Sequence, residues 1–165
     1  MSLPDAEQLL DTLAEKIRPL LGDDTALVGI YSGGAWIAQR LQEKLGADIP
    51  LGTLDISFYR DDFSRIGLHP QVKPSNIRFD VEGRHVVLVD DVLYTGRTVR
   101  AAMNELFDYG RPARISLAVL VDRGGRELPV DAQAVGAKME LPAGQNLELL
   151  QDAHGKLSLK LHEKK

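Results

Sequence analysis

Apolar runs and helical spacings alternate along the chain. Residues 86–89 are all aliphatic, which is typical of a strand buried on both faces of a parallel sheet. Further short strands are predicted at residues 26–31, 51–59 and 115–121, where apolar residues are consecutive or alternate with polar ones. We expect these segments to pair in one sheet.

Between the predicted strands, apolar residues recur every three or four positions. Residues 4–21 carry one apolar face that begins at Pro4, and a second helix follows Gly34 and stops at Gly46. A third helical pattern covers residues 99–107. Strands that alternate with helices indicate an α/β fold with a doubly wound, mainly parallel sheet.

Two segments depart from this alternation. Residues 147–150 and 157–161 flank a His-Gly turn and predict a β-hairpin, an antiparallel addition to the sheet. Residues 60–83 are polar, contain two prolines and show no sustained period. A segment of that length inside a compact domain is usually functional or mobile.

The composition narrows the classes of function. The 165 residues, 44% of them hydrophobic and 27% charged, are typical of one soluble domain. Because there is no cysteine, disulfides, thiol catalysis and cysteine-ligated metals are excluded. A net charge of −4 disfavours broad nucleic-acid binding, and no apolar run is long enough for a bilayer. We expect a cytoplasmic protein without membrane contact and without a signal peptide.

The residues with the clearest chemistry follow the strand at 86–89. Asp90 and Asp91 come where the carboxyl end of a parallel strand opens into a crevice. The small, hydroxyl-rich turn at residues 95–98 then leads into the third helix, whose first N–H groups favour an anion. Carboxylates beside an anion site suit a sugar phosphate, although two solvated aspartates and a plain helix cap at Thr98 are the alternative.

The string from residue 86 to 98, Val-Val-Leu-Val-Asp-Asp-Val-Leu-Tyr-Thr-Gly-Arg-Thr, resembles the phosphoribosyl diphosphate (PRPP) signature of type I phosphoribosyltransferases. Residues 55–62, 110–112 and 117–129 resemble one branch, the PyrR family of bifunctional pyrimidine-operon regulators and uracil phosphoribosyltransferases. The resemblance covers about residues 26–140. It implies that the protein converts uracil and PRPP to UMP and pyrophosphate with Mg²⁺.

The resemblance also implies a layout for a single domain over residues 1–165. A mobile β-arm at about 60–83 would close over the site. A small hood from about 123–165, to which the N-terminus contributes, would cover it from the other side. The family commonly forms homodimers or higher homo-oligomers, and we expect one here.

Roles for individual residues follow from the same resemblance. Asp90 and Asp91 would hold the ribose 2′ and 3′ hydroxyls and reach Mg²⁺ through water. The Tyr31–Ser32 peptide, in a loop that resembles strained ones, is expected to be cis. The remaining assignments are Arg60 and Arg123 as catalytic residues, Tyr94, Thr95, Gly96, Arg97 and Thr98 on the 5′-phosphate, Tyr31, Ser32, Gly33 and Gly34 on the pyrophosphate, and Val135 and Gly136 on the base.

Several of these residues have structural alternatives. Tyr94 stands where many purine enzymes of the superfamily carry an acid; a phenol titrates near about 10, so the base preference shifts towards a pyrimidine. It could instead only pack on the next helix. Gly33 and Gly34 could form an ordinary strand-to-helix turn, and Arg123 a surface ion pair.

Three functions therefore remain open. The first is uracil phosphoribosyl transfer, with or without a regulatory role. The second is a leader-mRNA-binding regulator that uses the site to sense a nucleotide, as in some bacterial relatives. RNA binding needs a basic surface, whereas residues 5–15 carry four acids. The third is transfer to another base, which Tyr94 disfavours.

Overall fold

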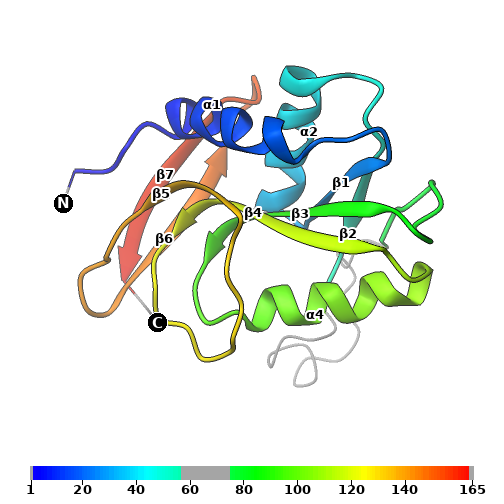
Figure 1. The fold of residues 1–165 in the computed structure, drawn as a ribbon. Coiled ribbons are helices and arrows are strands. Elements are labelled where there is room, and N and C mark those ends of the chain that lie inside the picture. The colour runs from blue at the N-terminus through cyan, green and yellow to red at the C-terminus, as the bar shows by residue number, and fades with distance from the viewer. Residues whose placement is uncertain (1, 57–74, 164–165) are drawn as a thin grey trace.

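A five-stranded parallel sheet forms the centre of the computed structural model, which describes residues 2–56 and 75–163 (Figure 1). Its strand order is β2-β1-β3-β4-β5, and every pairing in it is parallel. The elements are α1 (Ala6–Ile17), η1 (Arg18–Leu20), β1 (Thr25–Ile30), α2 (Gly33–Leu45), β2 (Leu51–Leu54), β3 (His85–Leu93), α4 (Arg97–Leu106), η3 (Phe107–Tyr109), β4 (Arg114–Asp122), β5 (Ala134–Lys138), β6 (Gln145–Gln151) and β7 (Leu157–Glu163).

Helices cover both faces of this sheet, as the doubly wound prediction requires. α1 and α2 lie on one face and α4 on the other (Figure 1). On the first face, Leu10, Leu13 and Ile17 of α1 are fully buried against the sheet. Burying one such side chain stabilises the fold by about 1.5–3 kcal/mol. The predicted α/β class is confirmed.

The central strand is longer than its apolar run. β3 was predicted at residues 86–89, but it continues through Asp90 and Asp91 to Leu93. The reason is pairing, because Asp90 is still in register with Val119 of β4. The two carboxylates are therefore held by a sheet ladder instead of a loose turn.

Helix starts also differ from the pattern by a residue or two. α1 begins after Asp5, whose Oδ1 accepts the N–H of Glu7 at 2.9 Å, and not at Pro4. α4 begins at Arg97 after Gly96, whose φ of 94° suits a glycine. Thr98 is thus inside the first turn of α4 and is not its N-cap. Apolar spacing predicts the face of a helix better than its caps.

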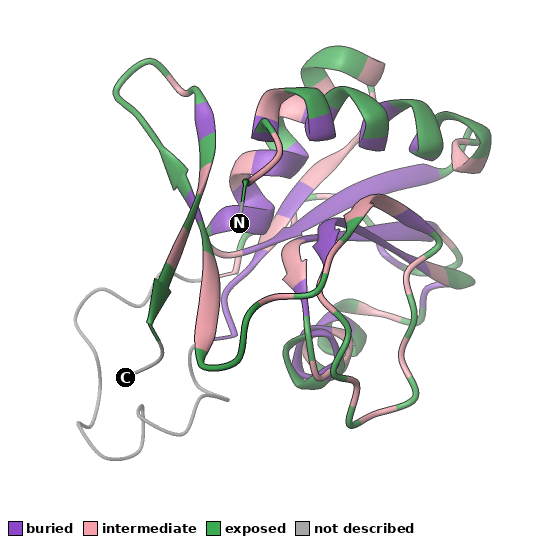
Figure 2. Ribbon diagram, turned by 90° about the vertical axis from the view of Figure 1, so that its left-hand side faces the viewer, coloured by how far each residue is buried: buried purple, intermediate pink, exposed green. Residues whose placement is uncertain are grey.

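The predicted hood divides into two parts. β5 returns to the parallel sheet beside β4, so the hood does not run unbroken from residue 123. The predicted hairpin is confirmed as β6 and β7, but it pairs only with itself among the described residues and adds no strand to the main sheet. In Figure 2 it stands at the side of the molecule. Leu149 and Leu157 of the hairpin are buried.

The predicted arm is described only in part. Residues 57–74, which include Arg60 and the end of the strand predicted at 51–59, lie outside the described residues. In the described remainder, Asn76 forms an antiparallel bridge with Thr53 next to β2. Among the described helices, none has the length and apolar character to cross a membrane.

A buried histidine, His85, lies at the amino end of the sheet. His85 Nε2 lies 2.9 Å from Ser116 Oγ, and its Nδ1 lies 3.4 Å from Thr25 Oγ1. Burial lowers the pKa of His85, and Arg114 lowers it further, against a weaker opposite effect of Asp24. The unfolded chain therefore binds the proton more readily than the folded one.

We expect the free energy of unfolding to fall as the pH drops from 7.5 through about 6.5, the ordinary histidine pKa, towards 5.5. Above that window His85 is neutral in both the folded and the unfolded state, so it adds no pH dependence to the free energy of unfolding. In His85→Gln this part of the pH dependence should disappear, whereas the same change at exposed His154 serves as the control. Urea unfolding at several pH values measures the effect. Equal pH dependence in wild type and His85→Gln would contradict the assignment.

Candidate active site

The two carboxylates lie at the carboxyl end of β3, in the middle of the sheet. Each is tied to the backbone that follows it. Asp90 Oδ1 accepts the N–H of Asp91 at 2.8 Å, and Asp91 Oδ1 accepts the N–H of Val92 at 2.8 Å. Asp90 is buried, at 6% exposure, and Asp91 is partly exposed. The two carboxylates thus lie at the crevice, and these hydrogen bonds restrict the movement of their side chains.

The loop before α2 closes one side of this crevice. A Cβ at Gly34 would collide with the backbone of Val89 and Asp90, and one at Gly33 with the carboxylate of Asp91. Glycine is therefore needed here for close approach, beyond the needs of an ordinary turn. The Tyr31–Ser32 peptide is cis, as expected.

The turn at residues 94–98 closes the opposite side. Thr95 Oγ1 accepts the N–H of Arg97 at 3.2 Å, and the carbonyl of Thr95 accepts N–H groups of Glu127 and Leu128 at 2.9 and 3.0 Å. The first turn of α4 contains no acidic residue, so its dipole is left for an external anion. The Arg97 side chain points away to Glu127, with Nε 2.9 Å from Oε1.

One cavity of about 150 Å³ joins these three parts. It brings the predicted pyrophosphate loop, the predicted ribose acids and one predicted phosphate residue together. A second cavity of about 480 Å³ shares Ser32, Gly33 and Asp91 and continues past Trp36 to β6. The residues lining the smaller cavity are Ile30, Tyr31, Ser32, Gly33, Asp90, Asp91, Val92 and Thr98.

Arg123 connects the turn at residues 94–98 with the hairpin. Its guanidinium lies 3.9 Å from the ring centroid of Tyr94, an arrangement that favours a cation–π interaction. It also donates to Asn146 Oδ1 at 3.2 Å and to the carbonyl of Gln145 at 3.3 Å. Neither a lone surface ion pair for Arg123 nor packing on α4 alone for Tyr94 describes these contacts.

Sequence reasoning missed Gln145 and Asn146. They begin a hairpin strand that is predicted from the spacing of its apolar residues alone. That spacing gives no information about the partners of polar residues, so nothing in the local sequence connects them to Arg123. Beside Arg123, a third cavity of about 400 Å³ lies at the carboxyl ends of β4 and β5 and includes Asp122 and Lys138. The hydrogen bonds from Arg126 to Asp122, at 2.9 and 2.7 Å, hold the pKa of Asp122 below its usual value.

Val135 and Gly136 lie in β5 and line none of these three cavities. The carbonyl of Val135 accepts a hydrogen bond from Lys16 Nζ at 2.8 Å. A Cβ at Gly136 would collide with the carbonyl of Leu120. Both residues are placed by sheet and helix packing, and their role in base binding stays a prediction. Arg60, the other catalytic candidate, lies outside the described residues.

Comparison with known proteins agrees with this geometry. The family model of the phosphoribosyl transferase domain matches residues 2–143, so the chain belongs to that family. A purine phosphoribosyltransferase of Pyrococcus horikoshii is 29% identical, with a TM-score of 0.63 and coverage of 85% of this chain and 86% of that one. A hypoxanthine-guanine phosphoribosyltransferase of Bacillus anthracis, at 19% identity and TM-score 0.66 over 84% and 83% of the chains, shares the fold.

Curated relatives narrow the family further. A protein of Pseudomonas fluorescens named bifunctional protein PyrR is 52% identical over 153 residues, 90% of this chain and 91% of the relative. Its namesake in Pseudomonas paraeruginosa is 51% identical over 154 residues, 91% of each chain. Within the phosphoribosyl transferase family, the chain groups with the PyrR proteins.

The glycine at the start of α2 offers a direct test of the loop geometry. Gly34→Ala should lower the free energy of unfolding by about 1–3 kcal/mol, because the added methyl group pushes α2 away from β3. Gly22→Ala is the matched control, since a Cβ there meets only atoms at 3.7 Å. Thermal unfolding compares the two. Equal stability of both variants would show that α2 does not need this close approach.

Proposed function

We propose that the protein transfers the 5-phosphoribosyl group of PRPP to uracil, releasing pyrophosphate and forming UMP. The observation that carries the proposal is the small cavity in which Asp90, Asp91, Thr98 and the loop at residues 31–33 meet. It offers carboxylates for a pentose and, on opposite sides, two loops suited to its 5′-phosphate and its pyrophosphate. The 52% identity to PyrR proteins and the phenol at Tyr94 favour uracil as the acceptor.

The reaction requires charge control around the ribose. As the bond from C1 to pyrophosphate breaks, positive charge develops on the ribose and negative charge on the leaving group. Asp90 and Asp91 would hold the 2′ and 3′ hydroxyls, and their charge would favour the cationic ribose. The first N–H groups of α4 would hold the 5′-phosphate, so that C1 stays in line between base and leaving group.

Mg²⁺ suits this donor set. The described residues contain no group of three or more His, Asp or Glu side chains able to hold a metal alone. Mg²⁺ typically uses one or two carboxylates together with substrate phosphates and water, and Asp90 and Asp91 can supply the protein share. When bound, the ion would neutralise charge on the pyrophosphate.

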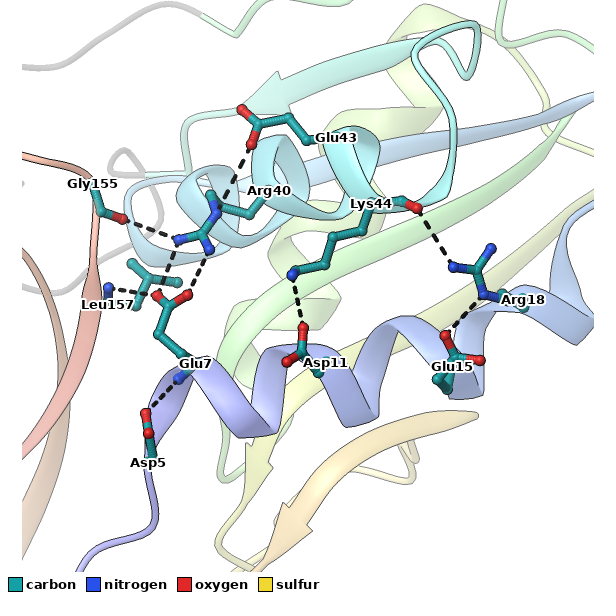
Figure 3. A network of polar contacts seen from close by, with 10 residues as sticks. All are labelled: Asp5, Glu7, Asp11, Glu15, Arg18, Arg40, Glu43, Lys44, Gly155 and Leu157. Atoms are coloured by element: carbon teal, nitrogen blue, oxygen red, sulfur yellow. Dashed lines mark hydrogen bonds and ion pairs between the residues drawn. The ribbon is translucent and has the colours of Figure 1, made fainter.

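A strong RNA-binding surface is disfavoured on the face made by α1 and α2. Three cations on or next to these helices are paired with carboxylates of α1, which lowers their attraction for phosphate. We infer that any regulatory role depends on nucleotide occupancy of the site more than on tight RNA contact. The pairs are Arg18–Glu15 at 3.0 Å, Arg40–Glu7 at 2.5 Å and Lys44–Asp11 at 2.7 Å (Figure 3).

The transfer is tested with PRPP, Mg²⁺ and a panel of uracil, hypoxanthine, guanine, adenine and orotate. We expect UMP from uracil and little product from the purines or orotate. Asp90→Asn and Asp91→Asn should each lower kcat/KM by about 100-fold or more, because a charge near the developing cation is lost. Exposed Asp48→Asn is the control. Preferred use of a purine, or full activity with both acids replaced, would overturn the proposal.

Leader-RNA binding is tested separately by titration of pyrimidine-operon leader RNA over a range of salt, with and without UMP. Weak binding that vanishes with added salt is expected, because few unpaired cations face outward on α1 and α2. Nanomolar binding that UMP strengthens would instead establish an RNA-binding regulator.

A further inference from the structure

Two consecutive carbonyls of the turn at residues 94–98 accept hydrogen bonds from the loop that follows β4, residues 123–131. The carbonyl of Tyr94 accepts a hydrogen bond from Arg126 Nη1 at 3.1 Å. The carbonyl of Thr95 accepts two backbone N–H groups of this loop at 2.9 and 3.0 Å. Both carbonyls therefore point towards the same loop.

The orientation of these two carbonyls fixes the orientation of the N–H groups that share their peptide planes. In a trans peptide the C=O and the N–H point in opposite directions, and both of these peptides are trans. The N–H groups of Thr95 and Gly96 consequently point away from the loop at residues 123–131. They lie at the start of α4, where the helix dipole favours an anion.

Arg126 is itself held in one orientation by its other hydrogen bonds. Its Nη1 and Nη2 donate to Asp122 Oδ1 and Oδ2 at 2.9 and 2.7 Å, which is a bidentate pairing. Its Nε donates to the carbonyl of Val130 at 2.8 Å. The side chains of Arg126 and Asp122 are only 23% and 9% exposed. With these bonds made, Arg126 presents Nη1 to the carbonyl of Tyr94 in a fixed direction.

We propose that Arg126 is a positioning residue for the 5′-phosphate of PRPP, which acts through the backbone of the turn at residues 94–98. It holds the carbonyl of Tyr94 on one side and thereby aims the N–H of Thr95 at the phosphate on the other. The inference rests on the proposed phosphoribosyl transfer. Among the described residues, no hydrogen bond of Arg126 reaches the loop at residues 31–34, which is the proposed pyrophosphate site. Loss of Arg126 therefore weakens binding of the 5′-phosphate more than binding of pyrophosphate.

The test compares variants that separate the contact with the turn from the stability of the fold. Arg126→Met removes every donor, and Arg126→Lys keeps a charged donor but lacks the fork that reaches Asp122 and Tyr94 together. Because Arg126→Met leaves the buried Asp122 carboxylate without its partner, the double variant Asp122→Asn with Arg126→Met removes that charge as well. Asp131→Asn is the matched control, because it changes an exposed contact of the same guanidinium, at 3.4 Å, and leaves Tyr94 untouched.

Binding of two partial ligands to each full-length protein is measured by isothermal titration calorimetry. Ribose 5-phosphate probes the 5′-phosphate site, and pyrophosphate with Mg²⁺ probes the loop at residues 31–34. In Arg126→Met and in the double variant, the Kd for ribose 5-phosphate should rise by about tenfold, because a hydrogen bond to a charged group is weakened. The Kd for pyrophosphate should change by less than about twofold, since its site is separate. Arg126→Lys should be intermediate, and Asp131→Asn should bind both ligands like wild type.

The outcomes distinguish this inference from the proposed function. No conversion of uracil by wild type refutes the proposed function, and the ribose 5-phosphate titrations then decide the role of Arg126 by themselves. That role is refuted if wild type does not bind ribose 5-phosphate, or if Arg126→Met binds it as tightly as Asp131→Asn does. An equal loss of affinity for both ligands in the double variant also refutes it, because Arg126 would then only stabilise the fold.

Discussion

The close approach of α2 to the end of β3 is the contact on which the site depends. Two glycines start the helix: Gly34 lies against the backbone of Val89 and Asp90, and Gly33 lies against the carboxylate of Asp91. Because of this close approach, the loop at residues 31–33 and the two acids line the same small cavity.

The rest of the site is held around that contact by two arginines. Arg123 at the end of β4 joins Tyr94 to the first residues of β6, and Arg40 joins α1, α2 and the far end of the hairpin. Both side chains act through fork-shaped hydrogen bonding that a lysine cannot reproduce. A small hairpin with little buried surface of its own is thereby held as a wall of the site.

The sequence predicts this molecule well where one local pattern is sufficient. The apolar run at 86–89, the acids after it and the turn at 95–98 are neighbours in the chain, so their grouping at the end of β3 could be foreseen. The cis Tyr31–Ser32 peptide was foreseen from resemblance to related loops. These features depend on short-range order and on a motif that keeps its spacing.

Long-range contacts were less predictable. Arg123 and Asn146 lie in segments whose apolar spacing predicts which residues are buried, but not which polar side chains meet. The pairing of β5 with β4 likewise places part of the range predicted for the hood in the main sheet. Val135 and Gly136 show the same limit, because strand pairing and Lys16 decide where their backbone groups point. Strand ends also shifted, since a ladder can extend past the last apolar residue, as it does at Asp90 and Asp91.

The position of the hairpin in the chain has a consequence for biosynthesis. A ribosome completes all five strands of the parallel sheet before it makes β6 and β7. Until then, the apolar surface that later receives Leu149 and Leu157 is open to water, and to any chaperone that recognises it. A nascent chain stalled at this stage would already contain the two acids and both glycines, but the apolar surface that Leu149 and Leu157 later cover would be exposed, and exposed apolar surface favours aggregation.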